Sequence, residues 1–597
     1  MPSPIRRSST AALATLLVLA GCRSPGGGES PAAGPSDRHS TVWVGASTPR
    51  SGSLEVKMMV PALETPTFDF VVPSWVPGDW TRRDFAKQIG DLRAKAEGGV
   101  DLPVERVGLS RFRVTTRGKS TVLLDYRLNS GSLEGGTSVV ERDGLRLLPG
   151  SFLGYVEGRR QDPVELFLSP PADSGWRVAT SLAKGEAPDT YRATTWDELS
   201  VSPILIGRLV EYRVEAPSGP AYLAAEGAGR ATLDAEFIAD CRRLLGAAET
   251  ALGRALAPRY QLMVHFADHR REAAVLGHPG SSELILGTPL VDETSRREAA
   301  RLAARALAAS LVAGIGLPEE ITRSGRETEA LSPSLWVADG IARHLGDKLE
   351  RAAGLIDDLE LLDRLSTGIR RVEDGRLRGQ PSLAERSRVA WGATATGQVS
   401  AAEMGAVWAA LLDLSIIAGS EGRRGLAGAL ASAVGPLDAG ALKKLCEAAG
   451  APSLDRFFAD CVDGSARPPY EATLAGAGLT LTAPEEALRN DIGLELERDR
   501  VVAVRPRSPA AKAGIEKEDR ILEFGGEAID GDLDRLVERF GKGSATTIAV
   551  LRRGENLVLP IAIDRKPARR YTVSAAAGVD AAVAARLAAY CTGVAPP

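Results

Sequence analysis

The sequence predicts an α+β protein of several domains: a β-rich N-terminal domain, a mostly helical middle domain and a small C-terminal domain rich in strands. At 597 residues the chain is longer than one hydrophobic core usually supports. Short runs in which apolar and polar residues alternate fill the first third, and apolar residues at helical spacing fill the middle. Alternation returns near residue 476, so two changes of pattern divide the chain into three folded parts.

The first 40 residues predict a leader and a tether. A basic start precedes a short apolar run, too short to span a bilayer of about 30 Å. The run ends in Leu-Ala-Gly-Cys, similar to a bacterial lipobox, so 1–21 is the expected lipoprotein signal peptide and Cys22 the expected lipidation site. An ordinary secretory signal with a chance cysteine is the alternative. Segment 22–40 would be a flexible tether. The expected location is the bacterial cell envelope, membrane-anchored by lipid; Arg23, which is not Asp, favours the outer membrane, facing the periplasm or the surface.

Residues 41–228 predict the β-rich domain. Runs of alternating apolar and polar residues are separated there by Gly, Pro and Ser turns. The clearest of these runs lie at 53–61, 68–75, 111–116 and 121–128. Many short strands of this kind predict a sandwich or a curled sheet.

Residues 229–470 predict the helical domain, which opens with a few strands. Its expected helices lie at 296–313, 335–353, 357–371, 401–417 and 439–449. Residues 476–565 predict a compact domain of strands with one amphipathic helix at 532–540, and 566–597 predict a helical tail.

The composition excludes one class of partner. A formal net charge of −4 and a pI near 6.0 argue against nucleic acid as the main ligand. The four cysteines beyond the leader form no C-x-x-C pair, so neither a redox motif nor a zinc knuckle is indicated. They are expected to be buried free thiols, although an oxidising compartment would permit a disulfide between the nearest two. They are Cys241, Cys446, Cys461 and Cys591, with Cys446 and Cys461 the nearest pair.

Several ordered motifs resemble the PDZ-tailed glycyl aminopeptidase family, peptidase family sixty-one among the gluzincins. Residues 73–80 fit the family's P-x-W-x-P-G-x-[YW] turn, and 196–209 resemble its Y-D-x-L-x-D-S-P-x-x-x-G segment. Residues 335–340 stand where the family has L-W-x-x-E-G. The resemblance covers nearly the whole chain after the tether. It implies a β-rich N-terminal domain, a thermolysin-like mostly helical domain and a C-terminal PDZ domain.

The resemblance also implies a zinc site, but its ligands are missing. In the family a helix carries H-E-x-x-H and a later acidic residue is the third ligand. Alignment on Pro318 puts Arg305, Ala306 and Ala309 at the helix positions and Asp339 at the third. A zinc hydrolase needs three protein ligands and an open water position, which an arginine and an alanine cannot supply. We therefore expect no metal or other cofactor and no peptidase activity by the family mechanism.

The lost metal predicts a compensating contact. Without zinc, the acid at position 339 would be partly buried and uncompensated, so an ion pair between Arg305 and Asp339 is expected across the old site. The alternative has Arg305 in solvent and Asp339 capping its helix.

The histidines offer a weaker prospect. A metal site built from His265, His269 and His278 is conceivable, but the first two do not share a helix face. His344 is expected to pack or to make a polar contact. The family's glutamate before the zinc helix is Gly277 here.

The C-terminal motifs resemble a bacterial PDZ domain. The resemblance makes 491–496 the carboxylate-binding loop and 508–515 the S-P-A-x-x-A-G-[IL] helix. A peptide or protein C-terminus would add to the edge strand by β-augmentation. The expected peptide-binding residues are Ile492, Gly493, Leu494, Glu495, Leu496 and Leu533. A PDZ fold that packs on its neighbour and binds nothing is the alternative.

These expectations combine into one functional hypothesis. The chain is expected to be an envelope-anchored pseudopeptidase that binds peptides or proteins through its PDZ domain and a vestigial cleft. The first alternative is an active metallo-aminopeptidase with a non-standard metal site, built around His278 and Asp339. The second is a structural lipoprotein without a peptide ligand.

Overall fold

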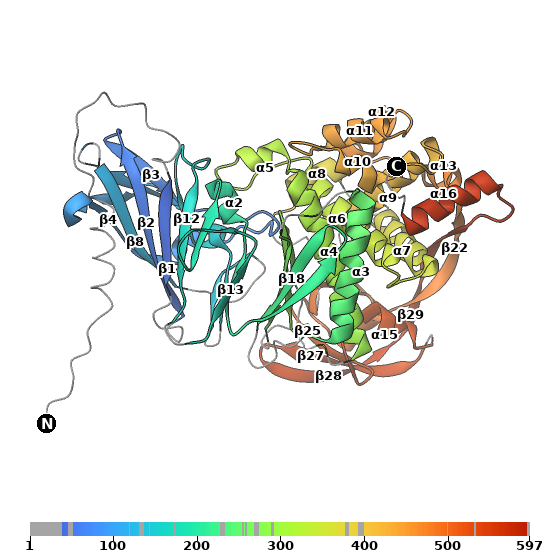
Figure 1. Ribbon diagram of the computed structural model, residues 1–597. Helices are drawn as coiled ribbons and strands as arrows, with labels where there is room; N and C mark the ends of the chain where they lie inside the picture. Colours follow the sequence, from blue (N-terminus) through green and yellow to red (C-terminus); the bar gives the residue numbers. More distant parts are fainter. Residues whose placement is uncertain are drawn as a thin grey trace.

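The structure, a computed structural model, describes residues 39–593 with internal gaps. The residues outside the description are 1–38, 46–51, 117, 119, 130–135, 142–143, 172–173, 227–232, 254–255, 257–258, 268–273, 288–289, 291, 377–380, 392–398, 498, 530–532, 542 and 594–597. The expected lipidation site Cys22 and the candidate ligand His269 therefore lie outside the described residues. Figure 1 shows the β-rich domain beside the helical domain, with the C-terminal strands packed beneath the helices.

The N-terminal domain is built on one large sheet and two small ones, as the alternating runs predict. Strand β8 (Ser120–Asn129) shows the reason, because buried side chains alternate along it with side chains that are partly or fully exposed. The large sheet has the order β14 (Ala183–Lys184), β15 (Thr190–Ala193), β12 (Val164–Ser169), β1 (Ser40–Gly45), β2 (Ser53–Leu63), β8 (Ser120–Asn129), β4 (Ile89–Ala96) and β5 (Asp101–Leu102).

Two four-stranded sheets complete this domain. One has the order β13 (Arg177–Thr180), β16 (Ile204–Gly207), β10 (Gly144–Leu147) and β9 (Val139–Val140). The other has the order β11 (Tyr155–Val156), β3 (Thr67–Val71), β7 (Arg111–Thr115) and β6 (Val104–Arg106). Short helical turns lie between strands, at Phe85–Lys87, Glu97–Gly99, Pro149–Ser151 and α2 (Trp196–Ser200).

The middle domain begins earlier than the sequence pattern suggested. Its sheet has the order β17 (Val210–Ala216), β18 (Gly219–Glu226), β19 (Gln261–Phe266), β21 (Ser281–Leu286) and β20 (Ala274–His278). Strands β17 and β18 were expected in the N-terminal domain, which was drawn to residue 228. Because β18 pairs in parallel with β19, the hairpin belongs to the middle domain.

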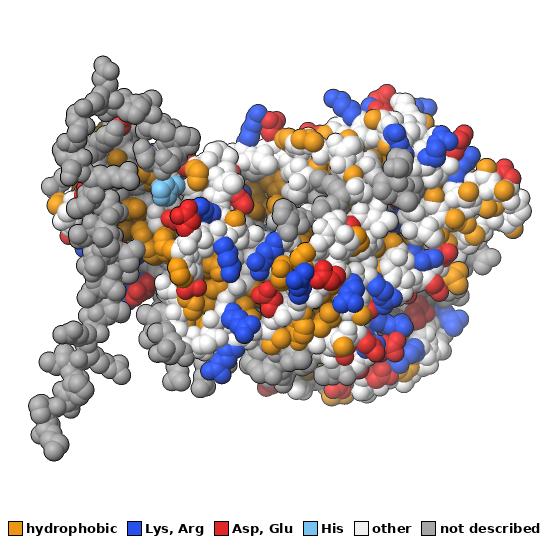
Figure 2. Space-filling view, in the orientation of Figure 1, with side chains coloured by type: hydrophobic (Ala, Val, Ile, Leu, Met, Phe, Trp, Pro, Cys, Tyr) orange, Lys and Arg blue, Asp and Glu red, His pale blue; other side chains and the backbone are white. Residues whose placement is uncertain are grey.

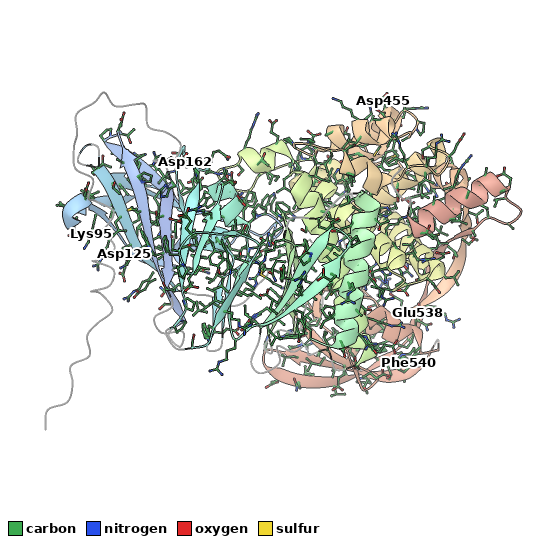
Figure 3. The ribbon with its side chains drawn as sticks, viewed as in Figure 1. Lys95, Asp125, Asp162, Asp455, Glu538 and Phe540 are labelled. Atoms are coloured by element: carbon green, nitrogen blue, oxygen red, sulfur yellow. The ribbon has the colours of Figure 1, made fainter. Side chains whose placement is uncertain are left out.

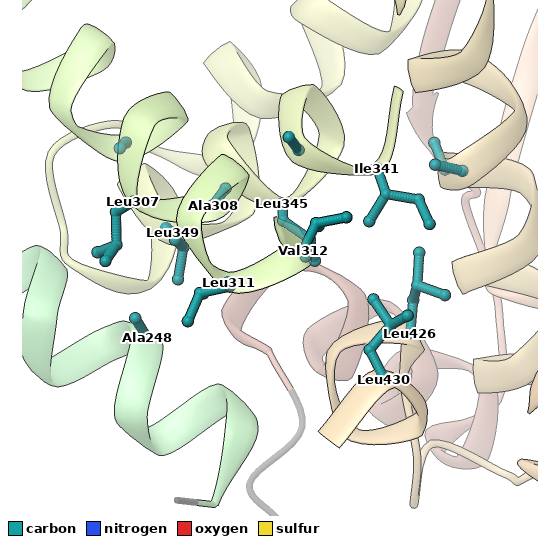
Figure 4. Packing of buried hydrophobic residues seen from close by; sticks show 14 of the residues in the cluster. Ala248, Leu307, Ala308, Leu311, Val312, Ile341, Leu345, Leu349, Leu426 and Leu430 are labelled. Atoms are coloured by element: carbon teal, nitrogen blue, oxygen red, sulfur yellow. The ribbon is translucent and has the colours of Figure 1, made fainter. Parts of the chain in front are cut away.

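Helices cover this sheet and form the rest of the domain. They are α3 (Ala235–Leu252), α4 (Glu293–Ile315), α5 (Glu319–Arg323), α6 (Leu335–Ala352), α7 (Asp358–Arg376), α8 (Leu383–Arg388), α9 (Ala401–Gly419), α10 (Leu426–Ala431), α11 (Ala439–Ala448), α12 (Asp455–Phe457), a π-helical turn (Phe458–Asp463) and α13 (Tyr470–Gly476). Figure 4 shows α4 and α6 meeting through Leu307, Leu311 and Val312 on one side and Ile341, Leu345 and Leu349 on the other.

Helix α9 lies at the centre of this bundle. It is long and apolar enough to cross a membrane by length and composition alone, yet 72% of its most apolar stretch is buried in the fold. Gly340 of α6 and Gly405 of α9 let the two backbones approach closely, because a Cβ on Gly340 would lie 2.5 Å from the Gly405 carbonyl carbon. The helix is therefore the core of the domain rather than a surface element.

The C-terminal domain contains a sheet ordered β23 (Leu494–Glu497), β24 (Arg500–Val504), β25 (Arg520–Phe524), β27 (Ala545–Arg552) and β28 (Glu555–Ala562). Strand β26 (Glu527–Ala528) pairs with β25, and helices α14 (Pro509–Ala513) and α15 (Leu533–Glu538) flank the sheet. Asn490, at the end of β22 (Leu479–Asp491), donates to the carbonyls of Glu538 and Phe540, which lie together at the end of α15 (Figure 3). These bonds fix that helix to β22.

A long antiparallel ribbon joins this domain to the helices. Strand β22 (Leu479–Asp491) pairs with β29 (Asp564–Ala575). The segment 566–597, expected to be a helical tail, thus starts as a strand and becomes helical only at α16 (Ala581–Thr592). The ribbon is tied to α7 where Val573 N–H donates to Ser366 Oγ at 2.9 Å.

Candidate functional site

An interdomain cleft of about 860 Å³ opens between the N-terminal and middle domains. The N-terminal domain contributes the turn at Pro77, Gly78 and Trp80, and the middle domain contributes its edge strand β20 and helices α4 and α6. The residues from these middle-domain elements are Val275, Gly277, His278, Ala309, Ala313, Ala338 and Asp339. The cleft therefore brings the Trp-Pro-Gly turn and the expected third-ligand position together.

Helix α4 presents two alanines to this cleft. Ala309 and Ala313 both line it, one turn apart, which is the spacing of the two histidines in H-E-x-x-H. Ala306 is fully buried, and its carbonyl accepts a hydrogen bond from Ser282 Oγ at 2.8 Å. Of the three expected helix positions only Ala309 reaches the cleft. The positions that the alignment on Pro318 gave therefore lie one helical turn before the residues of α4 that face the cleft. Ala313 was not identified from the sequence.

The expected pair between Arg305 and Asp339 is not formed. Gly346 stands opposite Arg305, since a Cβ on that glycine would lie 3.2 Å from the Arg305 Cα. Asp339 lies seven residues earlier on α6, a separation of about 10 Å at the helical rise. Arg305 instead lines a different cavity, in the company of Arg301 and Arg343.

Asp339 forms no ion pair with any residue that the structure describes, although the charge of Arg343 acts on it through space. Burial raises its pKa to about 6, and the neighbouring Trp80 indole and the Arg343 charge oppose that rise only in part. The Trp80 Nε1–H is buried and completes no hydrogen bond with a described residue. Asp339 is the fifth residue of α6, so it does not cap the helix either.

A buried ion pair between the two domains lies next to strand β20. Arg146 of β10 donates to both carboxylate oxygens of Glu283 on β21, at 3.1 and 2.8 Å, and both side chains are almost fully buried. His278 Nε2 lies 3.6 Å from the same carboxylate. Burial alone would raise the pKa of Glu283, but Arg146 and His278 outweigh it and the pKa is lowered.

Strand β20 packs directly on α4 at the wall of the cleft. A Cβ on Gly277 would lie 2.4 Å from the Ala309 Cβ and 2.4 Å from the Ser310 N. Ser310 Oγ also donates to the His278 carbonyl at 2.6 Å. Strand and helix are thus in contact through their smallest side chains, and larger ligating side chains at 277 or 309 would push them apart.

The remaining histidines do not join this site. His265 is buried and contacts Glu226 through Nδ1. His344 Nε2 lies 3.0 Å from Asp413 Oδ2, the polar contact that was expected of it. Across the described ranges, no group of three or more His, Cys, Asp or Glu residues is placed to hold a metal ion. The four described cysteines are free and buried.

The C-terminal domain holds the second candidate site, at its edge strand β23. Gly493 precedes this strand with a φ of 81°, and a Cβ there would lie 2.1 Å from the Ser508 Cβ, so the turn requires glycine. The Ile492 and Gly493 carbonyls accept from the Ala510 and Arg505 N–H groups at 2.9 Å. The apolar residues around the loop belong to the domain core: Ile492 and Leu533 are buried, and Leu494 and Leu496 pack against them.

The fold and the cleft define a two-domain scaffold of the metallopeptidase type with an appended small β-rich domain. Comparison with protein families supports each part: the peptidase M61 N-terminal domain matches residues 41–208, the M61 glycyl aminopeptidase matches 317–405, and a PDZ domain matches 500–552. The chain belongs to the M61 peptidase family, as its motifs suggested. The catalytic match begins at Leu317, just after α4.

One solved structure shows the same fold over nearly the whole chain, and a second is similar over a smaller part. An aminopeptidase N family protein from Idiomarina loihiensis is 20% identical, with a TM-score of 0.73 over 94% of this chain and 100% of that one. An M1 zinc metallopeptidase from Deinococcus radiodurans is 14% identical, with a TM-score of 0.46 over 72% of this chain and 95% of that one. No curated protein sequence matches the chain.

Proposed function

We propose that this protein is a pseudopeptidase that binds peptides or protein segments without hydrolysing them by zinc chemistry. One observation carries the proposal: the face of α4 that meets Asp339 in the cleft consists of Ala309 and Ala313. A hydrolytic zinc site needs three protein ligands and a general base beside the metal-bound water. Here the helix offers methyl groups at both histidine positions, and Ser310 stands where the glutamate base would be.

The residues of the cleft do not fit a zinc ion. Asp339 is one oxygen ligand, and alanine has no donor atom. His278 belongs to the other wall, close to the Glu283 carboxylate that Arg146 already binds. The contact between Gly277 and Ala309 leaves strand and helix too close for the missing ligands. We therefore derive no hydrolytic step through a metal.

The cleft is nevertheless built to receive an extended chain. Its volume of about 860 Å³ lies in the range of ligand-binding pockets. Strand β20 lines it and is the last strand of its sheet, so one of its edges has no strand partner among the described residues. Backbone groups on such an edge can pair with an extended peptide, as in β-augmentation.

The PDZ domain supplies the second binding surface. Strand β23 is the edge strand of its sheet, and the Gly493 turn enters it from the loop that would hold a terminal carboxylate. The expected contact residues are retained for this proposal: Ile492, Gly493, Leu494, Glu495, Leu496 and Leu533. A peptide or protein C-terminus is the proposed ligand.

The proposed setting is the bacterial cell envelope, with lipidated Cys22 as the anchor. This part rests on the lipobox-like sequence at the end of the leader. Metabolic labelling with a fatty-acid analogue tests it: the intact chain should incorporate label and Cys22→Ala should not.

Two assays on the same purified protein test the functional proposal. Binding is measured with a fluorescent peptide that ends in an apolar residue and a free carboxylate, with the amidated peptide as control. Hydrolysis is measured with glycyl and alanyl fluorogenic amides, with zinc added. The proposal predicts saturable binding of the free-carboxylate peptide and no hydrolysis above a heat-treated sample. Hydrolysis that a chelator abolishes would contradict it.

A working metallo-aminopeptidase remains the second candidate, because His278 and Asp339 line the same cleft. It predicts chelator-sensitive turnover that is lost in both His278→Ala and Asp339→Asn. Turnover that survives both substitutions would come from a contaminating peptidase and would remove this candidate.

A further inference from the structure

Arg305 points into a second cavity, of about 350 Å³, which is separate from the interdomain cleft. Residues of helices α4, α6, α7 and α9 line it, together with Tyr590 of α16. Arg301 and Arg305 of α4 and Arg343 of α6 lie near one another at one end of it. We call this space the arginine cavity, and these three residues its cationic end.

The cationic end has carboxylates nearby but few direct ion pairs, because Asp347 and Glu350 act on Arg305 only through space. Within the described part of the chain, Arg305 and Arg343 make no ion pair and no hydrogen bond through their side chains, and Arg301 reaches only Glu298, at 3.6 Å. The Nε atoms of Arg301 and Arg305 are buried without an acceptor. Burial, followed by repulsion from Arg343 and Arg301, lowers the pKa of the Arg305 guanidinium to about 10.

The carboxylates of the arginine cavity are engaged at its other end. Glu403 caps α9 through the Ser400 N–H and accepts from Arg371 at 3.0 Å, while Asp363 is exposed at the rim. The carboxylates bound by the single residue Arg364 are Asp347, Glu350 and Glu360, at 2.8, 2.7 and 2.7 Å. The direct ion pairs of these carboxylates are therefore made with Arg364 and Arg371, and among the described residues Arg305 and Arg343 have none.

Guanidinium groups without partners define the chemistry that would fill this end. An unpaired buried charge is costly, whereas a planar fork of N–H donors matches an oxyanion in a bidentate fashion. We propose that the arginine cavity binds a phosphate-type oxyanion between Arg305 and Arg343, with Arg301 as a third donor. The anion is either free phosphate or the phosphate group of a small ester. This site is independent of peptide binding in the cleft.

Equilibrium dialysis tests the proposal on the intact chain, purified in chloride buffer at neutral pH without phosphate or sulfate. The probes are inorganic phosphate and glycerol 3-phosphate. We expect one saturable equivalent per chain, with tighter binding of the ester if the cavity also holds its alcohol part. Arg305→Met and Arg343→Met should each weaken binding at least tenfold. Arg423→Met should bind like the parent, because Arg423 is exposed and paired with Glu421 at 2.8 Å.

Thermal unfolding distinguishes an anion-binding site from arginines that have no ligand. Thermal unfolding without phosphate should show Arg305→Met at least as stable as the parent, because a partly buried guanidinium without an ion pair among the described residues has been removed. Added phosphate should raise the melting temperature of the parent and of Arg423→Met but not of Arg305→Met. The proposal is overturned if the parent binds no phosphate saturably, or if Arg305→Met and Arg343→Met bind like the parent. Should Arg305→Met fail to fold, Arg343→Met alone decides.

Discussion

Gly277 on β20 lies directly against Ala309 on α4, so closely that a Cβ on the glycine would fall 2.4 Å from the alanine Cβ. The family resemblance places a glutamate at 277 and the structure places a cleft-facing helix position at 309. In this chain residue 277 is glycine and residue 309 is alanine, so strand and helix pack in direct contact. The contact leaves little room for larger side chains at either position.

The contact predicts a stability effect for Gly277→Ala. Added methyl volume in a packed interior costs about 1–3 kcal/mol, so the free energy of unfolding should fall by that amount. Urea denaturation measures it. Gly246→Ala is the matched control, because no atom lies within 4 Å of its Cβ position in helix α3, and alanine there should be neutral or stabilising. Equal effects at the two positions would mean that β20 and α4 are not in contact.

The buried ion pair Arg146–Glu283 predicts that removing only one of its two charges lowers the free energy of unfolding. Arg146→Met leaves the Glu283 carboxylate buried without its cation, which should cost about 3–5 kcal/mol of stability. The double replacement Arg146→Met with Glu283→Gln should recover part of that loss. A double replacement as unstable as the single one would show that packing, and not charge, dominates this interface.

The same pair predicts an acid dependence. The pKa of Glu283 is lowered in the folded state, so the pair contributes stability above the carboxyl's ordinary pKa and loses it as pH falls through the lowered value. The difference in unfolding free energy between parent and Arg146→Met should therefore shrink on acidification. A difference that stays constant from neutral to strongly acidic pH would contradict this.

Asp339 predicts the opposite dependence of stability on pH, because its pKa is raised and not lowered. Its pKa is raised to about 6, so its ionisation opposes folding: the fold is most stable where the carboxyl is protonated in both states and loses stability as pH rises through about 6. Asp339→Asn should therefore exceed the parent by about 2 kcal/mol at pH 8, with the advantage fading at pH 4. Urea denaturation at both pH values measures it. A less stable Asp339→Asn at pH 8 would mean that a bound cation normally holds this carboxylate.

The Gly493 turn predicts a specific loss of binding in the PDZ domain. Gly493→Ala meets both a positive φ and the Ser508 side chain, so the entry to β23 must distort. Binding of the free-carboxylate peptide should fall at least tenfold. Gly526→Ala also has a positive φ but meets no atom within 4 Å, so it controls for backbone strain alone and should keep the affinity.

The local sequence pattern predicted the long helices well, because hydrophobic periodicity depends on residues that are close together in the sequence. The helix expected at 335–353 is α6 (Leu335–Ala352), and the one expected at 401–417 is α9 (Ala401–Gly419). Surface charge followed composition in the same way: on the face in Figure 2, basic and acidic side chains are interspersed over the middle and C-terminal domains.

The pairing of strands that lie far apart in the sequence could not be predicted from local pattern. The hairpin β17–β18 was recognised as strand, but only its parallel partner β19 assigns it to the middle domain. Strand β29 was taken for part of a helical tail because its partner β22 lies far away in the sequence. The direction in which Arg305 points likewise depends on where α6 crosses α4. The crossing puts Gly346 opposite Arg305, and Asp339 lies about two helical turns away from that point.

Zinc content is the measurement that tests the central claim most directly. The intact purified chain is exposed to excess zinc, desalted and analysed for metal per chain, beside an authentic zinc aminopeptidase. We predict a value near zero, unchanged in Asp339→Asn, because the cleft offers one carboxylate and two alanines where three ligands are needed. A value near one that falls in Asp339→Asn or His278→Ala would contradict the account and place a metal in this cleft.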